Sequence, residues 1–208
     1  MKIKNIIFDL GGVIINLDYN RTANAFKELG FQHFDTIYSQ KKQEHLFDDF
    51  EKGILSPEQF RSILKQHFNK PVSDLEIDQA WNAMLLDIPA EKMELLNQLQ
   101  TNYRIFLLSN TNIIHVKAFT AILENAYGPN AFEKVFEKVY YSCFLKMRKP
   151  DHEIFEMVIN ENKLIKEETI FIDDSIHHVE GAIRSGIRGI HLANTDSLKV
   201  LINQILVD

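Results

Sequence analysis

Short apolar runs alternate with amphipathic stretches through most of this chain, and that alternation restricts its possible folds more than any other feature. The runs are rich in Ile, Val and aromatic residues and lack the polar alternation of a strand with one face in water. Buried strands of a parallel sheet have this composition. The predicted strands are residues 3–8, 105–108, 139–141, 169–172 and 187–192.

Helical patterns fill the intervals between these runs. Apolar residues recur at helical spacing in residues 91–100, 113–125, 151–161 and 175–185, and Gly186 follows the last stretch as a C-terminal stop. Strands that alternate with helices form an open parallel sheet with helices on both faces. The pattern therefore predicts an α/β fold with a doubly wound parallel sheet.

The segment from residue 18 to 88 interrupts the alternation. It shows helical patterns near residues 20–29, 57–67 and 74–85 but no run typical of a buried strand, and Pro89 follows it as a boundary. Ser56 is placed to cap the second of these helices. We expect a discontinuous Rossmann-like core and an inserted small helical cap above the carboxyl ends of the strands. The expected bounds are 1–16 and 89–208 for the core and 17–88 for the cap.

Composition argues against several classes of protein. The 208 residues carry a formal net charge of −6, which does not favour binding to nucleic acid or to an anionic membrane surface. One cysteine cannot form an intrachain disulfide, and the first residues lack the apolar run of a secretory signal. No apolar stretch approaches the roughly 20 residues of a membrane helix. We expect a soluble cytoplasmic protein, and the sequence leaves open whether it is a monomer or a dimer.

Polar residues collect where the predicted strands end. Parallel strands place their carboxyl ends at one edge of the sheet, so these side chains are expected to meet there. Carboxylates that lie close together repel one another unless a cation neutralises them, and oxygen ligands favour Mg²⁺. A metal beside a lysine and a hydroxyl suggests a small phosphorylated substrate, with a carboxylate attacking phosphorus. The residues are Asp9, Ser109, Asn110, Lys149, Asp173 and Asp174.

Four segments that contain these residues carry a family resemblance. In order, "IIFDLGGV", "IFLLSNT", "MRKP" and "IFIDDS" resemble the motifs of the haloacid dehalogenase-like (HAD) hydrolase superfamily, in the subfamily with a helical cap after the first motif. Together with "HVEGA" at residues 178–182, the set is most similar to bacterial α-D-glucose-1-phosphate phosphatases. The expected activity is that of a phosphoric monoester hydrolase.

The resemblance implies a role for each matched residue. Asp9 would be the nucleophile, and Ser109 and Lys149 would orient and neutralise the phosphoryl group, with Asn110 beside them in substrate binding. Mg²⁺ would be held by Asp9, by the main-chain carbonyl of Gly11, and by Asp173 and Asp174.

Gly11 is the position at which the chain departs from the pattern. Most phosphatases of this type have a second aspartate there, which protonates the leaving oxygen and later activates water. Only the main-chain carbonyl is used for the metal, so the metal site survives the change and the general acid does not. General acid catalysis is worth about 10² to 10⁴ in rate.

Three hypotheses account for the missing acid. A sugar 1-phosphate has an anomeric leaving oxygen, which departs more easily than an ordinary alcohol. A 2-haloacid dehalogenase needs neither a proton donor nor a metal, but it leaves Asp173 and Asp174 unexplained. The third hypothesis is a catalytically weak protein that binds a phosphorylated ligand or a partner through its cap, which the intact nucleophile and lysine argue against.

Two adjacent histidines near the last motif, His177 and His178, could suggest a transition-metal site. Neighbouring residues do not share one face of a helix, so the spacing favours a surface role for both. It leaves open a position of His178 near the edge of the sheet that carries the candidate site.

Overall fold

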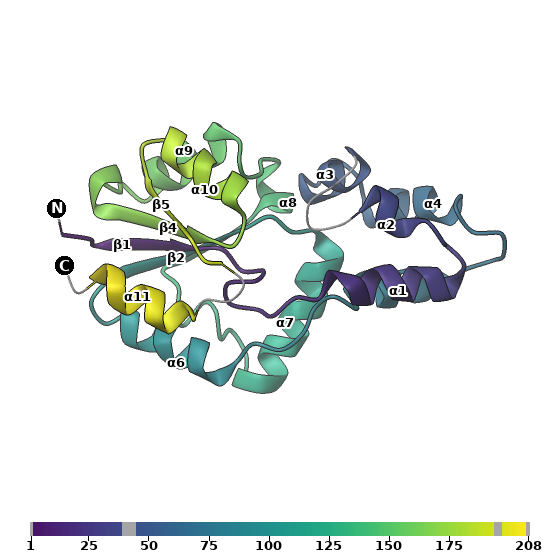
Figure 1. The fold of residues 1–208 in the computed structure, drawn as a ribbon, viewed down its shortest axis with the longest axis horizontal. Coiled ribbons are helices and arrows are strands. Elements are labelled where there is room, and N and C mark those ends of the chain that lie inside the picture. Colours follow the sequence, from purple (N-terminus) through teal and green to yellow (C-terminus); the bar gives the residue numbers. More distant parts are fainter. Residues whose placement is uncertain (1, 39–44, 194–196, 207–208) are drawn as a thin grey trace.

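A five-stranded parallel sheet forms the centre of the computed structural model, which describes residues 2–38, 45–193 and 197–206 (Figure 1). Its strand order is β3-β2-β1-β4-β5, with the first strand of the chain in the middle. The strands are β1 (Asn5–Phe8), β2 (Arg104–Ser109), β3 (Lys138–Tyr141), β4 (Thr169–Asp173) and β5 (Arg188–His191). All pairs are parallel, as the sequence predicted.

Helices cover both faces of the sheet. Residues of β1 alternate between the two apolar clusters: Ile6 and Phe8 pack with α6, α7 and α11, and Ile7 packs with α9 and α10. This confirms the doubly wound arrangement. The core helices are α6 (Ala90–Leu99), α7 (Ile113–Tyr127), α8 (Ser142–Leu145), α9 (His152–Glu161), α10 (Ile176–Arg184) and α11 (Leu198–Leu206), with a 3₁₀ turn at Lys166–Glu168.

The two edge strands correct one prediction. All five runs were expected to be buried, but β3 and β5 are only partly buried, because each has a neighbouring strand on one side. Only β1 and β4 are buried at every residue. An apolar run therefore indicated a strand correctly without indicating its place in the sheet.

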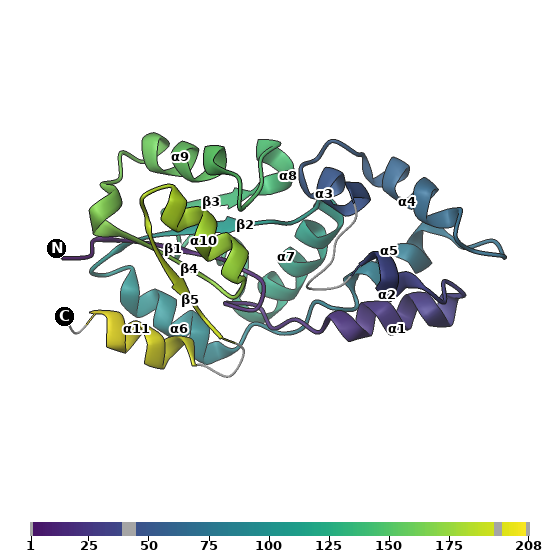
Figure 2. The same ribbon diagram turned by 45° about the horizontal axis from the view of Figure 1, so that its top comes forward.

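Among the described residues, five helices lie between β1 and α6 and are called the cap below (Figure 2). Their aromatic side chains build a separate apolar cluster in which Phe26 and Phe34 stack on each other and Trp81 is buried. Ser56 caps its helix through the main-chain N–H of Gln59, as predicted. The cap helices are α1 (Tyr19–Leu29), α2 (Phe34–Ile37), α3 (His45–Glu51), α4 (Pro57–Lys65) and α5 (Asp74–Asn82). Helices α2, α3, α8 and α11 were not predicted from the sequence.

A buried polar contact joins the cap to the core. The Asn112 side chain caps α7, and its Oδ1 also accepts the indole N–H of Trp81 from α5 at 3.3 Å. His115 stacks on Trp81, and its Nε2 lies 3.1 Å from the Trp81 carbonyl oxygen. Burial lowers the pKa of His115 to about 4, so the ring is neutral and donates from Nε2. One amide therefore fixes both the start of α7 and the position of α5.

A second contact joins the cap to the core through charge. The Arg148 guanidinium pairs with Asp48 and, at 3.0 Å, with Glu51 of α3. Arg148 directly precedes Lys149 in the loop between α8 and α9. Neighbouring residues of this loop thus reach the cap and the strand ends.

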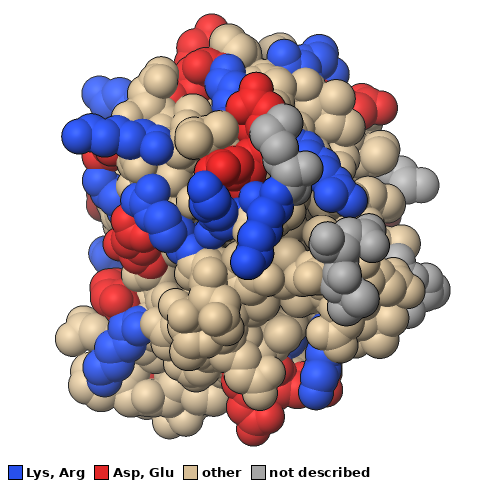
Figure 3. Space-filling view, turned by 90° about the vertical axis from the view of Figure 1, so that its left-hand side faces the viewer, with Lys and Arg blue, Asp and Glu red and all other residues tan. Residues whose placement is uncertain are grey.

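The amino ends of the strands form the opposite side of the molecule, where lysine and arginine side chains stand among acidic ones (Figure 3). Ion pairs join neighbouring elements there, including Lys4 with Glu168 and Arg104 with Glu137. Exposed pairs of this kind contribute little to stability individually. Within the described residues, no helix is both long and apolar enough to cross a bilayer.

Candidate active site

The carboxyl ends of the central strands bring the predicted polar residues together. Asp9 directly follows β1 and Asp173 ends β4, and the Lys149 ammonium lies between them, 2.5 Å from Asp9 Oδ1 and 2.6 Å from Asp173 Oδ2. Lys149 is completely buried. A fully buried lysine is stable only when its charge is paired, and here two carboxylates pair with it.

Burial and neighbouring charges shift the pKa values of the three acids in this cluster in different directions. Burial raises the pKa of Asp9 to about 6, although Lys149 opposes the shift. Burial and the Asp9 and Asp173 charges raise the pKa of Asp174 to about 7. Burial alone would raise the pKa of Asp173 too, but Lys149 and His178 lower it below its usual value. Asp173 therefore carries its charge more readily than the other two acids.

Three carboxylates of the cluster are placed to hold one cation. Oxygen atoms of Asp9, Asp173 and Asp174 all lie within 4.8 Å of one another. A hard divalent ion binds such an oxygen-only set, and it would favour the ionised forms of the two acids whose pKa is raised. The residues present fit Mg²⁺.

Glycines give the loop after β1 its close approach to these acids. Gly12 has φ +73°, and a Cβ on it would lie 2.3 Å from Asp174 Oδ2. A Cβ on Gly11 would lie 2.7 Å from Leu17 Cδ1 and 4.0 Å from Asp9 Oδ2. The space beside Gly11, where relatives were expected to hold an acid, is therefore occupied by an apolar side chain.

Ser109 ends β2 and Asn110 follows it, beside the lysine loop. Ser109 is buried at the strand end. The Asn110 amide donates to the main-chain carbonyl of Lys149 at 2.8 Å and accepts its N–H at 2.9 Å. This side chain, predicted to bind substrate, is thus engaged in fixing the main chain that carries the lysine.

His178 belongs to the site, although its place in the sequence favoured the surface. His177 is exposed, as favoured, whereas His178 is only partly exposed and takes the other position left open for it, near the strand ends. His178 Nδ1 lies 3.1 Å from both oxygens of Asp173, and Asp173 also accepts the main-chain N–H of Ser175 at 2.8 Å. The first turn of α10 aims one histidine inward and its neighbour outward, a difference of about 100° per residue.

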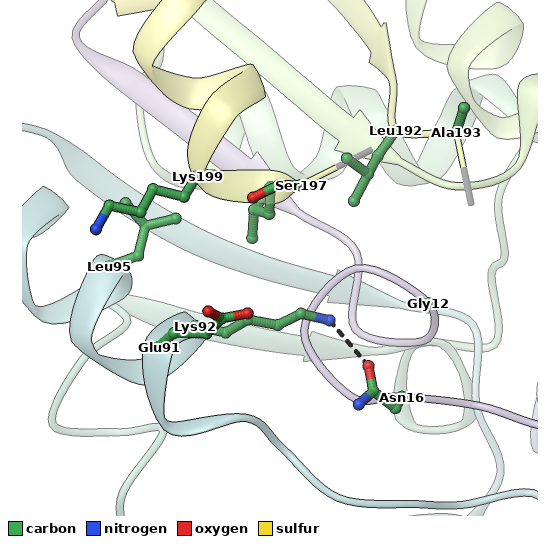
Figure 4. A pocket seen from close by; sticks show the side chains of 10 residues that line it. Gly12, Asn16, Glu91, Lys92, Leu95, Leu192, Ala193, Ser197 and Lys199 are labelled. Carbon is green, nitrogen blue, oxygen red and sulfur yellow. Dashed lines mark hydrogen bonds between the residues drawn. The ribbon is translucent and has the colours of Figure 1, made fainter. Parts of the chain in front are cut away.

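A cavity beside the Gly12 loop does not coincide with this cluster. It is lined by Gly12, Asn16, Lys92 and residues of the α11 region, and Lys92 Nζ donates to Asn16 Oδ1 at 3.2 Å (Figure 4). None of the three acids nor Lys149 lines it. The polar cluster, rather than this cavity, is the candidate active site.

Comparison with known proteins places this arrangement among hydrolases. The family model of haloacid dehalogenase-like hydrolases matches residues 3–186. D-ribitol-5-phosphate phosphatase of Bacteroides thetaiotaomicron is 32% identical over 177 residues, which cover 85% of either chain. The sesquiterpene phosphatase astK of Aspergillus oryzae is 29% identical over 94% of this chain and 91% of its own.

A solved structure extends the comparison to three dimensions. An HAD-family enzyme of Bacteroides thetaiotaomicron, in complex with magnesium and inorganic phosphate, superposes with a TM-score of 0.89 at 39% identity. The match covers 96% of this chain and 98% of that chain. None of these three proteins is described as a glucose-1-phosphate phosphatase.

Proposed function

The chain belongs to the haloacid dehalogenase-like hydrolase family, and from this premise we propose that it is a Mg²⁺-dependent phosphatase of a small phosphorylated metabolite. One observation carries the proposal: a buried lysine pairs with Asp9 and Asp173, while Asp174 completes a three-carboxylate cluster. The Bacteroides structure with magnesium and phosphate supports both the cofactor and the type of ligand.

In the proposed mechanism Asp9 attacks phosphorus and forms an aspartyl phosphate, which water then hydrolyses. Lys149 neutralises charge on the phosphoryl oxygens, and Asn110 holds the lysine main chain in place. The Ser109 hydroxyl orients the same group. Asp9, Asp173, Asp174 and the Gly11 carbonyl would hold Mg²⁺, which would supply further charge neutralisation.

The cap defines the space for the leaving alcohol. We assign it residues 17–88, and the core residues 1–16 and 89–208, because α1–α5 build their own apolar cluster. A cap over the strand ends excludes water during attack by Asp9. It also leaves room for a small substrate rather than a protein.

Two classes of substrate follow from different observations. Gly11 provides no acid, which favours a sugar 1-phosphate because its anomeric oxygen leaves readily. The ribitol-5-phosphate phosphatase favours a sugar-alcohol phosphate, whose leaving group is a poorer primary alcohol. The 2-haloacid dehalogenase is disfavoured because it needs no metal and leaves the three-carboxylate cluster unexplained. The catalytically weak binding protein is disfavoured because the nucleophile Asp9 and its paired lysine are both present.

Phosphate release from a panel of sugar and sugar-alcohol phosphates tests the proposal. Release should require Mg²⁺, stop with chelator and be lost in Asp9→Asn, which keeps the shape of the side chain. No release above background from any ester, or full activity of Asp9→Asn, would overturn it. Halide release from 2-haloacids without metal would establish the dehalogenase instead.

A further inference from the structure

The carboxyl end of α3 rests on the core segment that carries Lys149. Residues 142–151, called the lysine segment below, run from the start of α8 to the N-cap of α9. Ser142 is the first of them, and its Oγ lies 2.7 Å from the Glu51 carbonyl oxygen. The same Oγ accepts the Thr111 N–H at 2.9 Å. One hydroxyl therefore joins the end of a cap helix to the loop that follows β2.

Two further contacts join the cap to the lysine segment. Gly53 has φ +63°, and a Cβ on it would lie 2.1 Å from the Cys143 carbonyl oxygen, so the two main chains touch at this point. Beside it, Lys52 Nζ lies 3.3 Å from Asp151 Oδ2. The cap thus reaches both ends of the segment.

Arg148 makes the contact nearest to the catalytic lysine, which directly follows it in the sequence. Its guanidinium pairs with Asp48 and, at 3.0 Å, with Glu51 Oε2. The side chain of Arg148 is 16% exposed, and those of Asp48 and Glu51 are 31% and 12% exposed. Because three charges form a partly buried network, it contributes more than an isolated exposed ion pair does.

The acids that hold Arg148 move only with the cap. Phe47 and Phe50, on the same helix, are buried in the cap cluster and fix α3 to it. The chain itself connects cap and core before α1 and after α5, so the contacts of α3 with the core are non-covalent and separable. Any displacement of the cap from the core therefore takes Asp48 and Glu51 away from Arg148.

The main chain that follows Arg148 is fixed to the active site. Asn110 accepts the Lys149 N–H at 2.9 Å and donates to its carbonyl oxygen at 2.8 Å. Lys149 Nζ in turn reaches Asp9 and Asp173. The rigid peptide unit between Arg148 and Lys149 therefore has the cap on one side and the catalytic acids on the other, so a shift of one residue displaces its neighbour.

We propose that Arg148 is a positioning residue that links closure of the cap to the placement of Lys149. Through Asp48 and Glu51 it holds the cap over the site, and through the shared main chain it keeps the lysine segment in its active arrangement while the cap is closed. Arg148 itself does not touch the substrate. The proposal rests on the phosphatase function given above.

Variants that remove charge from either side of the contact test the link. Arg148→Gln removes the guanidinium, and the double variant Asp48→Asn, Glu51→Gln removes both carboxylates but keeps the Glu51 carbonyl for Ser142. Coupling between two parts of a protein typically changes an affinity by about 5- to 150-fold, and for this partly exposed network we expect kcat/KM for phosphate esters to fall about 5- to 20-fold in either variant. When all three changes are combined, kcat/KM should fall no further, because both variants break the same contact.

Arg61→Gln is the matched control. Arg61 is 15% exposed and pairs with Asp78 through two hydrogen bonds of 2.8 Å, but both residues belong to the cap. Its loss should lower the stability toward urea without changing kcat/KM. Losses that multiply in the combined variant would show that Arg148 acts on Lys149 without the cap and would overturn the proposal. Full activity of the double variant, or an equal loss in Arg61→Gln, would overturn it as well.

Hydrogen exchange of the lysine segment provides a readout that needs no activity. Amides of residues 142–151 should exchange faster in Asp48→Asn, Glu51→Gln than in the unchanged protein, although none of these residues is substituted, and at the unchanged rate in Arg61→Gln. Equal exchange in all three proteins would refute the link. If the unchanged protein hydrolyses no ester, the phosphatase function is refuted, and the exchange rates still decide whether the cap holds the segment.

Discussion

Placing an aspartate at residue 11 should reveal why the position is a glycine. The backbone of Gly11 lies outside the left-handed region, so the obstacle is a contact rather than a strained dihedral angle. The new Cβ would lie 2.7 Å from Leu17 Cδ1, well inside ordinary contact. Leu17 is partly buried and packs against both the core and the cap clusters, so its movement costs packing on two sides.

The overlap with Leu17 determines how much stability Gly11→Asp should lose. Overpacking of this kind costs about 1 to 3 kcal/mol, and Leu17→Ala alone should lose less than the roughly 2 to 5 kcal/mol of a fully buried leucine. The two changes share one contact. We therefore expect the double variant Gly11→Asp, Leu17→Ala to lose less unfolding free energy than the sum of the two single losses, by about 1 kcal/mol or more. Urea unfolding of the four proteins measures this coupling.

The effect on rate follows from the chemistry of the acid. Its Cβ lies 4.0 Å from Asp9 Oδ2, and a neighbouring negative charge favours the protonated form that a general acid needs. In the double variant, kcat/KM for primary-alcohol phosphates should increase by up to about 10²-fold, the lower end of the range for general acid catalysis. For sugar 1-phosphates kcat/KM should change little. Additive stability losses, or equal rate changes on both ester classes, would refute the reasoning.

Two further changes test the cluster. In Asp174→Asn without metal, the stability advantage over the unchanged protein should grow from about pH 4 to 7 and then level off, because the folded acid keeps its proton to about pH 7 and the unfolded acid does not. Urea unfolding in chelator measures it, and a pH-independent difference would contradict it. His178→Ala should raise the Mg²⁺ concentration needed for half-maximal activity about tenfold, because Asp173 loses its contacts to the histidine. His177→Ala should not, and equal effects would argue against a local contact.

The predictable part of the molecule depends on local pattern. Strands, most core helices and the residues after each strand follow from apolar periodicity, and the parallel topology then brings Asp9, Lys149 and Asp173 together. The short helices α2, α3 and α8 were missed because each is about one or two turns long, too short for periodicity to register. The exposure of β3 and β5 depends on strand order, which periodicity does not contain.

The unpredicted contacts of the site are long-range. Leu17 against Gly11 depends on the path of the chain into the cap, and the Arg148 pair with α3 joins residues about one hundred positions apart. The inward position of His178 could have been found from Ser175, the N-cap of α10, because residues three apart share a face and Ser175 lies beside the acids. Because the two histidines are adjacent, the same surface position was favoured for both.

The contact made by Asn112 limits how such enzymes can change their substrates. Its one side chain serves both the helix that follows the Ser109 strand and the Trp81 indole of the cap. A cap without a tryptophan at this place would lose the indole hydrogen bond to Asn112 and the ring that stacks on His115, both beside the catalytic strand end. An exchange of caps between relatives therefore has to keep Trp81, Asn112 and His115 together as one unit.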